Sequence, residues 1–397
     1  MTKINSINRT ALMPNYAPAS FIPRKAKKSV IWDENGKDYI DFGGGIAVTC
    51  LGHSHPKLNK VVREQSQNLW HVSNYLYNKP ALELSKLLTE KTFADKVFFS
   101  NSGNEANEAA IKLARKYFFD KGEKEKNEIV VFTGAFHGRS MLNITAGDSE
   151  FQKTGFGPLL KGFKRARFND LKSAKKAVTS KTAAIFIEPI QGESGVIRAE
   201  NPFLMGLRKL ADDNECLLIF DEVQSGIGRT GSLMAYMGYG VKPDIATIAK
   251  GLGGGIPIGA TIANTEVAKG FQLGTHGSTF GGNPLACAVS KEVVEIISSQ
   301  KLLNGVMKKT IKFVSQLETL SKKYNLFTEI RSAGLWICCD FNKIKAKDFI
   351  ESCYKKGLII VQASGEKTIR MAPSLIIEDK EIDEGFKRFE RAIKASI

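Results

Sequence analysis

Short apolar runs alternate with amphipathic stretches through the middle of the sequence, and this alternation constrains the fold more than any other feature. Strand-length runs between helical patterns are typical of a parallel sheet wound with helices. Between two of the runs, apolar residues recur from Ala106 to Tyr117 at helical spacing, which predicts an amphipathic helix over residues 103–119. The sequence therefore predicts an α/β fold with a large, mostly parallel sheet. The expected strands are residues 96–100, 128–133, 183–189, 216–222, 245–250 and 259–264.

The two ends of the chain have different patterns, which predict a smaller second domain. Asn35 and Gly36, placed between alternating residues, are typical of a β-hairpin. A long helical stretch over residues 286–323 leads into the apolar run GLWICCDF, two helix-like segments and the run TIRMAPSL. We expect an N-terminal segment (1–45) that packs with the small domain, a large α/β domain (46–285) and a C-terminal α+β domain (286–397).

The net charge of +16 would suit a nucleic-acid or membrane-surface partner, because a positive field attracts polyanions. The densest basic run, over residues 161–176, is nevertheless typical of solvated helix and loop faces, and no nucleic-acid-binding motif accompanies it. We therefore expect neither a nucleic-acid nor a membrane partner. The charge favours small anions, such as phosphates and dicarboxylates, near the surface.

The cysteines and the N-terminus predict a cytoplasmic protein. None of the six cysteines has C-x-x-C or zinc-site spacing, so we interpret them as buried thiols in a reducing compartment. The N-terminal stretch MTKINSINRTALMPNYAP lacks the apolar core of a signal peptide. The longest apolar runs, such as LLIF at 217–220, are far shorter than the ~18 residues that a membrane span needs.

A strand that ends in Asp221 carries the first chemical signal. In the run IFDEVQSGIGRTG, Asp221 and Val223 share one face because side chains alternate along a strand. A literal G-x-G-x-x-G begins at Gly226, but we reject a dinucleotide site. The Rossmann turn needs glycines directly after the strand, whereas Asp221 and Glu222 occupy this turn, and no acidic residue ends a strand about 20 residues later.

The second signal is Lys250, which ends the run IATIAK and is followed by GLGGG. A lone lysine is usually a solvated surface charge. A lysine at the end of an apolar strand, beside backbone with few side chains, is poorly placed for solvation. Such a position suits Schiff-base chemistry, for which a lowered pKa makes the amine nucleophilic.

Two weaker signals follow other strands. Ser102 and Gly103 open the predicted helix, where free backbone N–H groups and the helix dipole suit an anion, although they would equally form an ordinary N-cap. Phe136 and Arg139, in the run FHGRS, are suited to stacking and to carboxylate binding, or else are a core phenylalanine and a surface arginine.

Together, an aspartate at a strand end, a lysine about thirty residues later and a phosphate-binding helix start are what pyridoxal phosphate (PLP) requires. The sequence here resembles the class III aminotransferases, which are PLP enzymes of fold type I. The resemblance runs from about Tyr16 to the C-terminus. Its motifs are YAPASFIP, ENGKDYIDFGGGIAV, LGHSHP, NSGNEANEAAIKLAR, FHGRS, EPIQGESGV, IFDEVQSGIGRTG, PDIATIAKGLGGGIPIGA, HGSTFGGNPLACA and IRMAPSLII.

The resemblance implies specific roles around the cofactor. Lys250 would bind it as a Schiff base and move a proton between the substrate Cα and the cofactor C4′. Asp221 would keep the pyridine nitrogen protonated. The other implied cofactor contacts are Gln224 at the phenolic oxygen, Phe136 and Val223 on the two ring faces, Ser102 and Gly103 at the phosphate, and Thr279 from the partner subunit of a homodimer with active sites at its interface.

The resemblance also implies a site for two kinds of substrate. Arg370 would bind the α-carboxylate of glutamate or 2-oxoglutarate, and Glu193 would pair with Arg370 when a diamino substrate is bound. Arg139 would hold the α-carboxylate of N-acetylornithine. Tyr16 and Ser278 would be further contacts with that donor.

Three departures or details of the motifs sharpen this interpretation. His137 favours donors of the acetylornithine type, because the ornithine enzymes of the class tend to have tryptophan at its position. Asn104 stands where the family usually has threonine or alanine, which puts a hydroxyl contact with the phosphate in doubt. His53, His55 and His71 have no metal partner in the sequence, so we expect no metal site.

The implied activity is PLP-dependent transfer of the δ-amino group of N2-acetyl-L-ornithine to 2-oxoglutarate in a ping-pong cycle, a step of arginine biosynthesis. Rivals within the class use succinyl-diaminopimelate, ornithine or 4-aminobutyrate as amino donor. Rivals from other classes are a PLP aminomutase or decarboxylase and a polyanion-binding protein without enzymatic activity.

Overall fold

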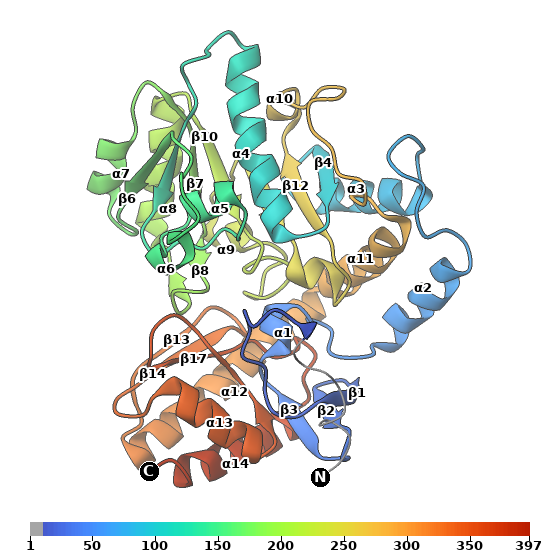
Figure 1. The fold of residues 1–397 in the computed structure, drawn as a ribbon, viewed down its shortest axis with the longest axis vertical. Helices are drawn as coiled ribbons and strands as arrows, with labels where there is room; N and C mark the ends of the chain where they lie inside the picture. Colours follow the sequence, from blue (N-terminus) through green and yellow to red (C-terminus); the bar gives the residue numbers. More distant parts are fainter. Residues whose placement is uncertain (1–10) are drawn as a thin grey trace.

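The computed structural model describes residues 11–397. These residues form a seven-stranded sheet with its helices and a smaller region with two four-stranded sheets (Figure 1). Residues 1–10 of the predicted N-terminal segment lie outside the described residues. In spatial order the strands of the large sheet are β4 (Lys96–Ser100), β12 (Gly259–Ala263), β11 (Ile245–Ile248), β10 (Leu217–Asp221), β7 (Thr182–Ile187), β5 (Glu128–Phe132) and β6 (Phe163–Ala166).

The large sheet is mostly parallel, as predicted. Strands β11, β10, β7, β5 and β6 pair in parallel, and only β12 runs antiparallel to both of its neighbours, β11 and β4. All six strands expected from the sequence form: β4 has the predicted bounds, β7 begins one residue earlier, and β5, β7, β10, β11 and β12 end one or two residues earlier than predicted. The carboxyl ends of the parallel strands therefore meet at one edge of the sheet, where ligands bind in open α/β sheets.

Helices cover both faces of this sheet because its residues alternate between two apolar clusters. Along β10, Leu217 and Ile219 pack in one cluster, whereas Leu218 and Phe220 pack in the other. The first cluster is covered by α4 (Gly103–Asp120), which lies in front of the sheet in Figure 1, with α5 (Met141–Ala146) and α10 (Thr265–Ala268). The second is covered by α3 (Lys79–Lys91), α7 (Leu171–Ala177), α8 (Asn201–Asp213) and α11 (Pro284–Ile297).

Strand β6 was not expected, because the sequence analysis read its residues as part of a solvated basic run. The strand lies at the edge of the sheet, where Lys164 is exposed and Ala166 is buried. Arg165 donates to the carbonyls of Phe132 and Gly147, at 2.9 and 2.7 Å. Charged residues protect an edge strand from pairing with other chains, so this part of the basic run has a structural use.

The smaller region contains the C-terminal part of the chain and the N-terminal strands. Its main sheet has the order β13 (Phe327–Ser332), β14 (Ile337–Phe341), β17 (Thr368–Met371) and β16 (Val361–Gln362), packed with α12 (Gln300–Tyr324), α13 (Ala346–Lys355) and α14 (Asp379–Lys394). The second sheet has β1 (Pro23–Lys27), β2 (Val30–Asp33), β3 (Asp38–Asp41) and β15 (Leu358–Ile359), and the antiparallel pair β2–β3 confirms the predicted hairpin. Because β3 pairs with β15, the two ends of the chain share a sheet.

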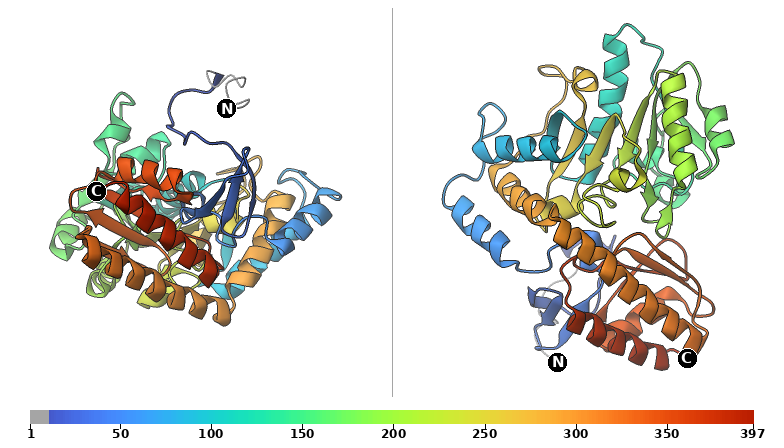
Figure 2. Two further views of the ribbon diagram at one scale, coloured as in Figure 1. Left: turned by 90° about the horizontal axis from the view of Figure 1, so that it is seen from below. Right: turned by 180° about the vertical axis from the view of Figure 1, so that it is seen from behind.

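The predicted helix over residues 286–323 is two helices, α11 and α12. The chain leaves α11 at Ser298, and the Ser299 side chain accepts a hydrogen bond from the Leu302 N–H as the N-cap of α12. Serine competes for backbone donors in this way, which explains the break. In the view from behind, the two helices follow each other from the large sheet to the smaller region (Figure 2).

The glycines of the rejected G-x-G-x-x-G motif form the joint between the two regions. A Cβ on Gly228 would lie 2.5 Å from the Ile297 side chain, and one on Gly231 would lie 2.6 Å from the sulfur of Met307. Between them, the buried Arg229 donates to the carbonyls of Leu335 and Pro373, at 2.8 and 2.7 Å. These glycines therefore serve close packing and not a pyrophosphate.

Short elements complete the described chain: α1 (Gly44–Ala47), α2 (Pro56–Ser66), α6 (Glu150–Lys153), α9 (Ala235–Tyr239), β8 (Ile190–Gln191) and β9 (Ile197–Arg198). All six cysteines are free and buried, as predicted for the thiols. No helix within residues 11–397 is both long and apolar enough to cross a bilayer. In the same residues, no three acidic, cysteine or histidine side chains gather closely enough to hold a metal ion.

Candidate active site

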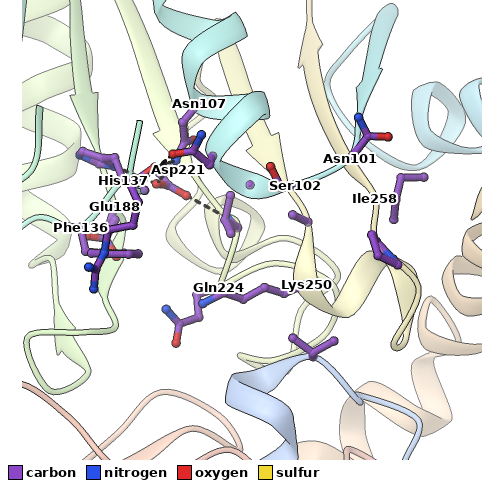
Figure 3. A pocket seen from close by; sticks show the side chains of 18 of the residues that line it. Asn101, Ser102, Asn107, Phe136, His137, Glu188, Asp221, Gln224, Lys250 and Ile258 are labelled. Atoms are coloured by element: carbon purple, nitrogen blue, oxygen red, sulfur yellow. Dashed lines mark hydrogen bonds and ion pairs between the residues drawn. The ribbon is translucent and has the colours of Figure 1, made fainter. Parts of the chain in front are cut away.

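A cavity of about 410 Å³ opens at the carboxyl edge of the large sheet (Figure 3). Residues that follow β4, β5, β7, β10 and β11 line it, because these strands end at the same edge. Eight of the predicted site residues line the cavity: Ser102, Gly103, Phe136, Arg139, Asp221, Val223, Gln224 and Lys250.

Asp221, the last residue of β10, is oriented by contacts at both of its carboxylate oxygens. Its Oδ2 accepts a hydrogen bond from Asn107 Nδ2 at 2.8 Å and lies 2.8 Å from His137 Nδ1. Asn107 is held in turn by Thr247 of β11, whose hydroxyl lies 2.6 Å from Asn107 Oδ1. Among residues 11–397, Oδ1 of Asp221 accepts only the Val223 N–H. The carboxylate is therefore oriented, with lone pairs of Oδ1 available to a ligand in the cavity.

Asn107 and Thr247 were not predicted as site residues, and His137 was predicted only to favour one class of donor. Asn107 is a polar residue within the buried stripe of α4, and a polar residue at such a position is the signal that would have indicated a buried partner. His137 is fully buried and stacks on Phe186 with ring centroids 4.0 Å apart. This packing fixes the imidazole beside Asp221.

Lys250 begins a 3₁₀ turn (Lys250–Gly253) two residues after β11 ends. Its φ of +46° is unusual for a residue with a side chain and marks a strained position. Burial lowers the pKa of Lys250 to about 8, and Arg370 acts in the same direction, whereas Glu193 and Asp221 oppose the shift. A larger fraction of this amine is therefore neutral at physiological pH than of an ordinary lysine.

The start of α4 lies against the turn after β10. Ser102 is the N-cap of this helix, and its hydroxyl oxygen accepts the Glu105 N–H at 3.2 Å, as the ordinary N-cap interpretation predicted. Its hydroxyl proton can still be donated to the cavity. Gly103 allows close packing, because a Cβ there would lie 2.5 Å from the Val223 side chain. The first backbone N–H groups of α4 thus border the cavity.

Phe136 and Arg139 lie on the loop after β5. The backbone N–H of Phe136 donates to Glu188 at 2.9 Å, and the Arg139 guanidinium carbon lies 5.6 Å from the centre of the Phe136 ring. The Arg139 side chain is exposed and has no acidic partner among the described residues. Arg139 is exposed and borders the cavity, and Phe136 is half-buried, so stacking and carboxylate binding stay predictions for this pair.

Glu188, at the end of β7, is a cavity residue to which the sequence analysis gave no role. It accepts the N–H groups of Phe136 and Gly192 and is buried. Burial and the nearby Asp221 raise the pKa of Glu188 well above its usual value, although the two N–H donors act against this shift. Its position in the run EPIQGESGV, directly after an apolar strand, was the available signal.

Arg370 and Glu193 form an ion pair beside the cavity. Arg370 is 2% exposed, and its Nη1 lies 2.9 Å from Glu193 Oε1 and 3.2 Å from Gln224 Oε1. Burial disfavours the charged form of Glu193, but Arg370 and Lys250 outweigh it and lower the pKa of Glu193. Glu193 is therefore ionised and neutralises Arg370.

Besides Glu193 and Arg370, three predicted residues do not line the cavity of one chain: Tyr16, Ser278 and Thr279. Tyr16 is 83% exposed. Ser278 and Thr279 line a second cleft of about 400 Å³, which shares Asn101 with the cavity. The Ser278 hydroxyl oxygen accepts hydrogen bonds from Asn101 Nδ2 and the Gly281 N–H, each at 3.0 Å. Ser278 and Thr279 thus lie beside the cavity and Tyr16 is not among its lining residues, so these three roles stay predictions.

Comparisons with known proteins identify the family. The model of the family "Aminotransferase class-III" matches residues 12–393. The acetylornithine aminotransferase of Pseudomonas putida is 49% identical over 385 residues, covering 96% of this chain and 95% of the relative.

Two solved structures have the same fold. The N-acetylornithine aminotransferase of Stenotrophomonas maltophilia has a TM-score of 0.84 and 36% identity, covering 95% of this chain and 96% of that one. The ornithine aminotransferase of Toxoplasma gondii, in which PLP partly occupies the active site, has a TM-score of 0.93 and 30% identity, covering 98% and 93%. The chain belongs to the class III aminotransferases and is a PLP-dependent transaminase of fold type I.

Proposed function

We propose that this enzyme transfers the δ-amino group of N2-acetyl-L-ornithine to 2-oxoglutarate, giving N-acetyl-L-glutamate 5-semialdehyde and L-glutamate. The observation that carries the proposal is the different state of two arginines. Arg370 is buried and neutralised by Glu193, whereas Arg139 at the cavity is exposed and has no acidic partner within residues 11–397. The names of the Pseudomonas putida and Stenotrophomonas maltophilia relatives support the same donor.

The residues of the cavity fit the cofactor that the family uses. Asp221 has an oriented carboxylate with an available oxygen, Lys250 has an amine of lowered pKa, and Ser102 and Gly103 border the cavity with the N-terminus of a helix. These groups match a pyridine nitrogen, an aldehyde and a phosphate, respectively. When PLP is bound there, its aldehyde reacts with the amine of the donor. Its ring accepts the electron pair that remains when the carbon bearing this amine loses its proton.

The protein side chains then have distinct tasks. Asp221 would hold a proton at the pyridine nitrogen, with Asn107 and His137 keeping its carboxylate in place. The Lys250 amine would take the proton from the donor's reacting carbon and return one to the cofactor C4′. Phe136 and Val223, which line the cavity, would exclude water from the two faces of the ring, and Gln224 would donate to its phenolic oxygen.

Glu193 allows one site to accept two different substrates. While it neutralises Arg370, the region near Lys250 accepts the uncharged body of acetylornithine, whose α-carboxylate binds Arg139. When glutamate or 2-oxoglutarate binds, its α-carboxylate takes the bidentate guanidinium of Arg370, and Glu193 moves away. The substrate that binds would thus decide whether the Arg370 charge is neutralised by Glu193 or by a substrate carboxylate.

A panel of amino donors with 2-oxoglutarate tests the proposed activity, and Arg139→Lys tests the residue assignment. The variant keeps the charge but loses the planar fork, so we expect KM for acetylornithine to rise about tenfold and KM for glutamate to change less than about twofold. If the wild-type enzyme had a higher kcat/KM for ornithine, succinyl-diaminopimelate or 4-aminobutyrate than for acetylornithine, the assignment of acetylornithine as the donor would be overturned. Equal losses for acetylornithine and glutamate would remove Arg139 from the donor site.

We also propose that the active unit is a homodimer. Large apolar side chains are exposed on two neighbouring segments, 69–77 and 273–280. Among them, the Tyr75 side chain is 97% exposed. The segments contact each other through the 2.8 Å hydrogen bond from Asn74 Nδ2 to the Ser278 carbonyl. An exposed apolar surface of this kind is typical of an interface. The same segments carry Ser278 and Thr279, so a second copy would bring these residues to the cavity.

Sedimentation of the holoenzyme tests this interface. We expect Leu273→Asp, on the apolar surface, to raise the dimer dissociation constant by at least about tenfold, because a charge would be buried there. Phe119→Asp is the matched control, since Phe119 is an exposed apolar residue near the far end of α4. A monomeric wild-type holoenzyme, or equal effects of the two changes, would contradict the proposed interface.

A further inference from the structure

Asn104, the second residue of α4, joins this helix to the loop that carries Arg139. Its side-chain oxygen, Oδ1, accepts hydrogen bonds from the backbone N–H groups of Arg139 at 2.7 Å and Ser140 at 2.8 Å. The Asn143 side chain donates to the same oxygen at 2.9 Å and to the Asn104 carbonyl at 2.7 Å. One amide oxygen therefore holds two consecutive peptide groups of the loop.

The close approach of Asn104 to the loop depends on Gly138. This glycine has a φ of +133°, and a Cβ there would lie 2.3 Å from Asn104 Oδ1. A glycine next to an acceptor thus lets the loop turn tightly over the helix. Alanine at position 104 would supply no acceptor, and the hydroxyl of threonine is one bond shorter than the amide oxygen. Neither side chain can replace the pair of contacts that Asn104 makes.

The loop is consequently fixed on both sides of its turn. At one end Glu188 accepts the Phe136 N–H at 2.9 Å, and at the other Asn104 accepts the Arg139 and Ser140 N–H groups. The Arg139 side chain leaves the backbone at this second anchor and extends over the Phe136 ring at the cavity. The direction of its guanidinium is therefore set by a peptide group that Asn104 holds.

We propose that Asn104 is a positioning residue that determines donor selectivity through Arg139. This inference rests on the proposed function, in which Arg139 binds the carboxylate of acetylornithine. With Asn104 in place, the guanidinium is oriented before the donor arrives, and little conformational entropy is lost on binding. Without it, the two N–H groups lack an acceptor, the loop relaxes, and the donor must order Arg139. Glutamate, bound through Arg370, does not incur this cost.

Steady-state kinetics of Asn104→Ala and Asn104→Thr test the inference. We expect both to raise KM for acetylornithine about fivefold to tenfold, with KM for glutamate changed less than about twofold and kcat for glutamate retained. Ser140→Ala is the matched control: it removes the N-cap hydroxyl of α5 but keeps the two N–H groups that Asn104 accepts, so both KM values should stay near those of the wild type. A selective loss in Ser140→Ala equal to that in Asn104→Ala would reduce Asn104 to a general support of the loop and overturn the inference.

A double-mutant cycle with Arg139→Ala separates positioning from any direct contact. If Asn104 acts through Arg139, Asn104→Ala should have no further effect on KM for acetylornithine in the Arg139→Ala background. Additive losses would overturn the inference. If the Arg139→Ala enzyme kept the donor selectivity of the wild type, Arg139 would not bind the donor. This result would contradict the proposed function and not only the role of Asn104.

Two readouts do not depend on turnover. Amide hydrogen exchange of the segment around Arg139 and Ser140 should be at least about tenfold faster in Asn104→Ala than in the wild type and unchanged in Ser140→Ala. The affinity of the apoenzyme for PLP, measured by fluorescence titration, should change less than about threefold in Asn104→Ala. Unchanged exchange would overturn the inference. A large loss of PLP affinity with an unchanged donor ratio would also overturn it and would assign Asn104 to the cofactor phosphate instead.

Discussion

Replacing Lys250 by alanine is expected to lower turnover by about 10⁴-fold and to remove the visible absorbance of the covalently held cofactor. The proposed mechanism uses the Lys250 amine both to bind the cofactor and to move the proton at the reacting carbon. No other lysine lines the cavity among the described residues, so none can take its place. Absorbance spectra and single-turnover kinetics with acetylornithine measure the two losses.

Lys309→Gln is the control for Lys250→Ala. Burial also lowers the pKa of Lys309, but its amine donates to the Leu375 carbonyl at 2.9 Å and does not line the cavity. We expect this variant to keep the absorbance and most of the turnover. A Lys250→Ala enzyme that turns over acetylornithine at close to the wild-type rate would refute the proposed mechanism.

The pH dependence of Lys250 follows from its lowered pKa. Only the neutral amine attacks an aldehyde, so the rate at which the apoenzyme captures PLP should rise with pH, level off above about 8 and fall roughly tenfold per pH unit below it. Glu193 raises the pKa of Lys250, so Glu193→Gln should move the midpoint to lower pH. Stopped-flow absorbance measures the midpoint, and a value near that of free lysine would contradict this assignment.

Replacing Asp221 by asparagine is expected to lower kcat about 10³-fold while leaving the cofactor attached to Lys250. The amide keeps the shape of the side chain but cannot hold a proton at the pyridine nitrogen as a carboxylate does. The ring then accepts electrons poorly, whereas binding of the aldehyde is unaffected. The retained absorbance distinguishes this variant from Lys250→Ala.

The neighbouring Glu222 provides the comparison for Asp221. Glu222 is equally buried, but its carboxylate accepts the backbone N–H groups of Ala235 and Tyr236 and does not line the cavity. Glu222→Gln should therefore lower the melting temperature and change kcat by less than about threefold. If Glu222→Gln and Asp221→Asn lost the same activity, the special role of Asp221 would be disproved.

The sequence predicted the residues that follow strands better than those that reach the site from elsewhere. Asp221 and Lys250 could be found because an apolar strand fixes where its last residue lies. The family resemblance supplied the pairing of Glu193 with Arg370, which lie 177 positions apart in the chain, and the structure brings them to 2.9 Å. A local sequence pattern cannot reveal a contact between residues so far apart in the chain.

The errors have local physical causes. Strand β6 was missed because its two central residues, Lys164 and Arg165, are charged, so the strand shows neither an apolar run nor an apolar alternation. The helix over 286–323 was predicted as continuous because its apolar spacing hides the capping serine at position 299. Asn107 was missed since a polar residue in a buried stripe shows its partner only after Asp221 and Thr247 have been placed by the sheet.

The glycine-lined joint around Arg229 has a consequence for stability. Its guanidinium is buried, and burial lowers its pKa to about 10. Within the part of the chain that the structure describes, it has no carboxylate partner and depends on the carbonyls of Leu335 and Pro373. If the smaller region detached, this charge would lose its acceptors, so the two regions should melt as one cooperative unit. A cofactor that binds at the edge of the large sheet would thereby protect strands that it never touches.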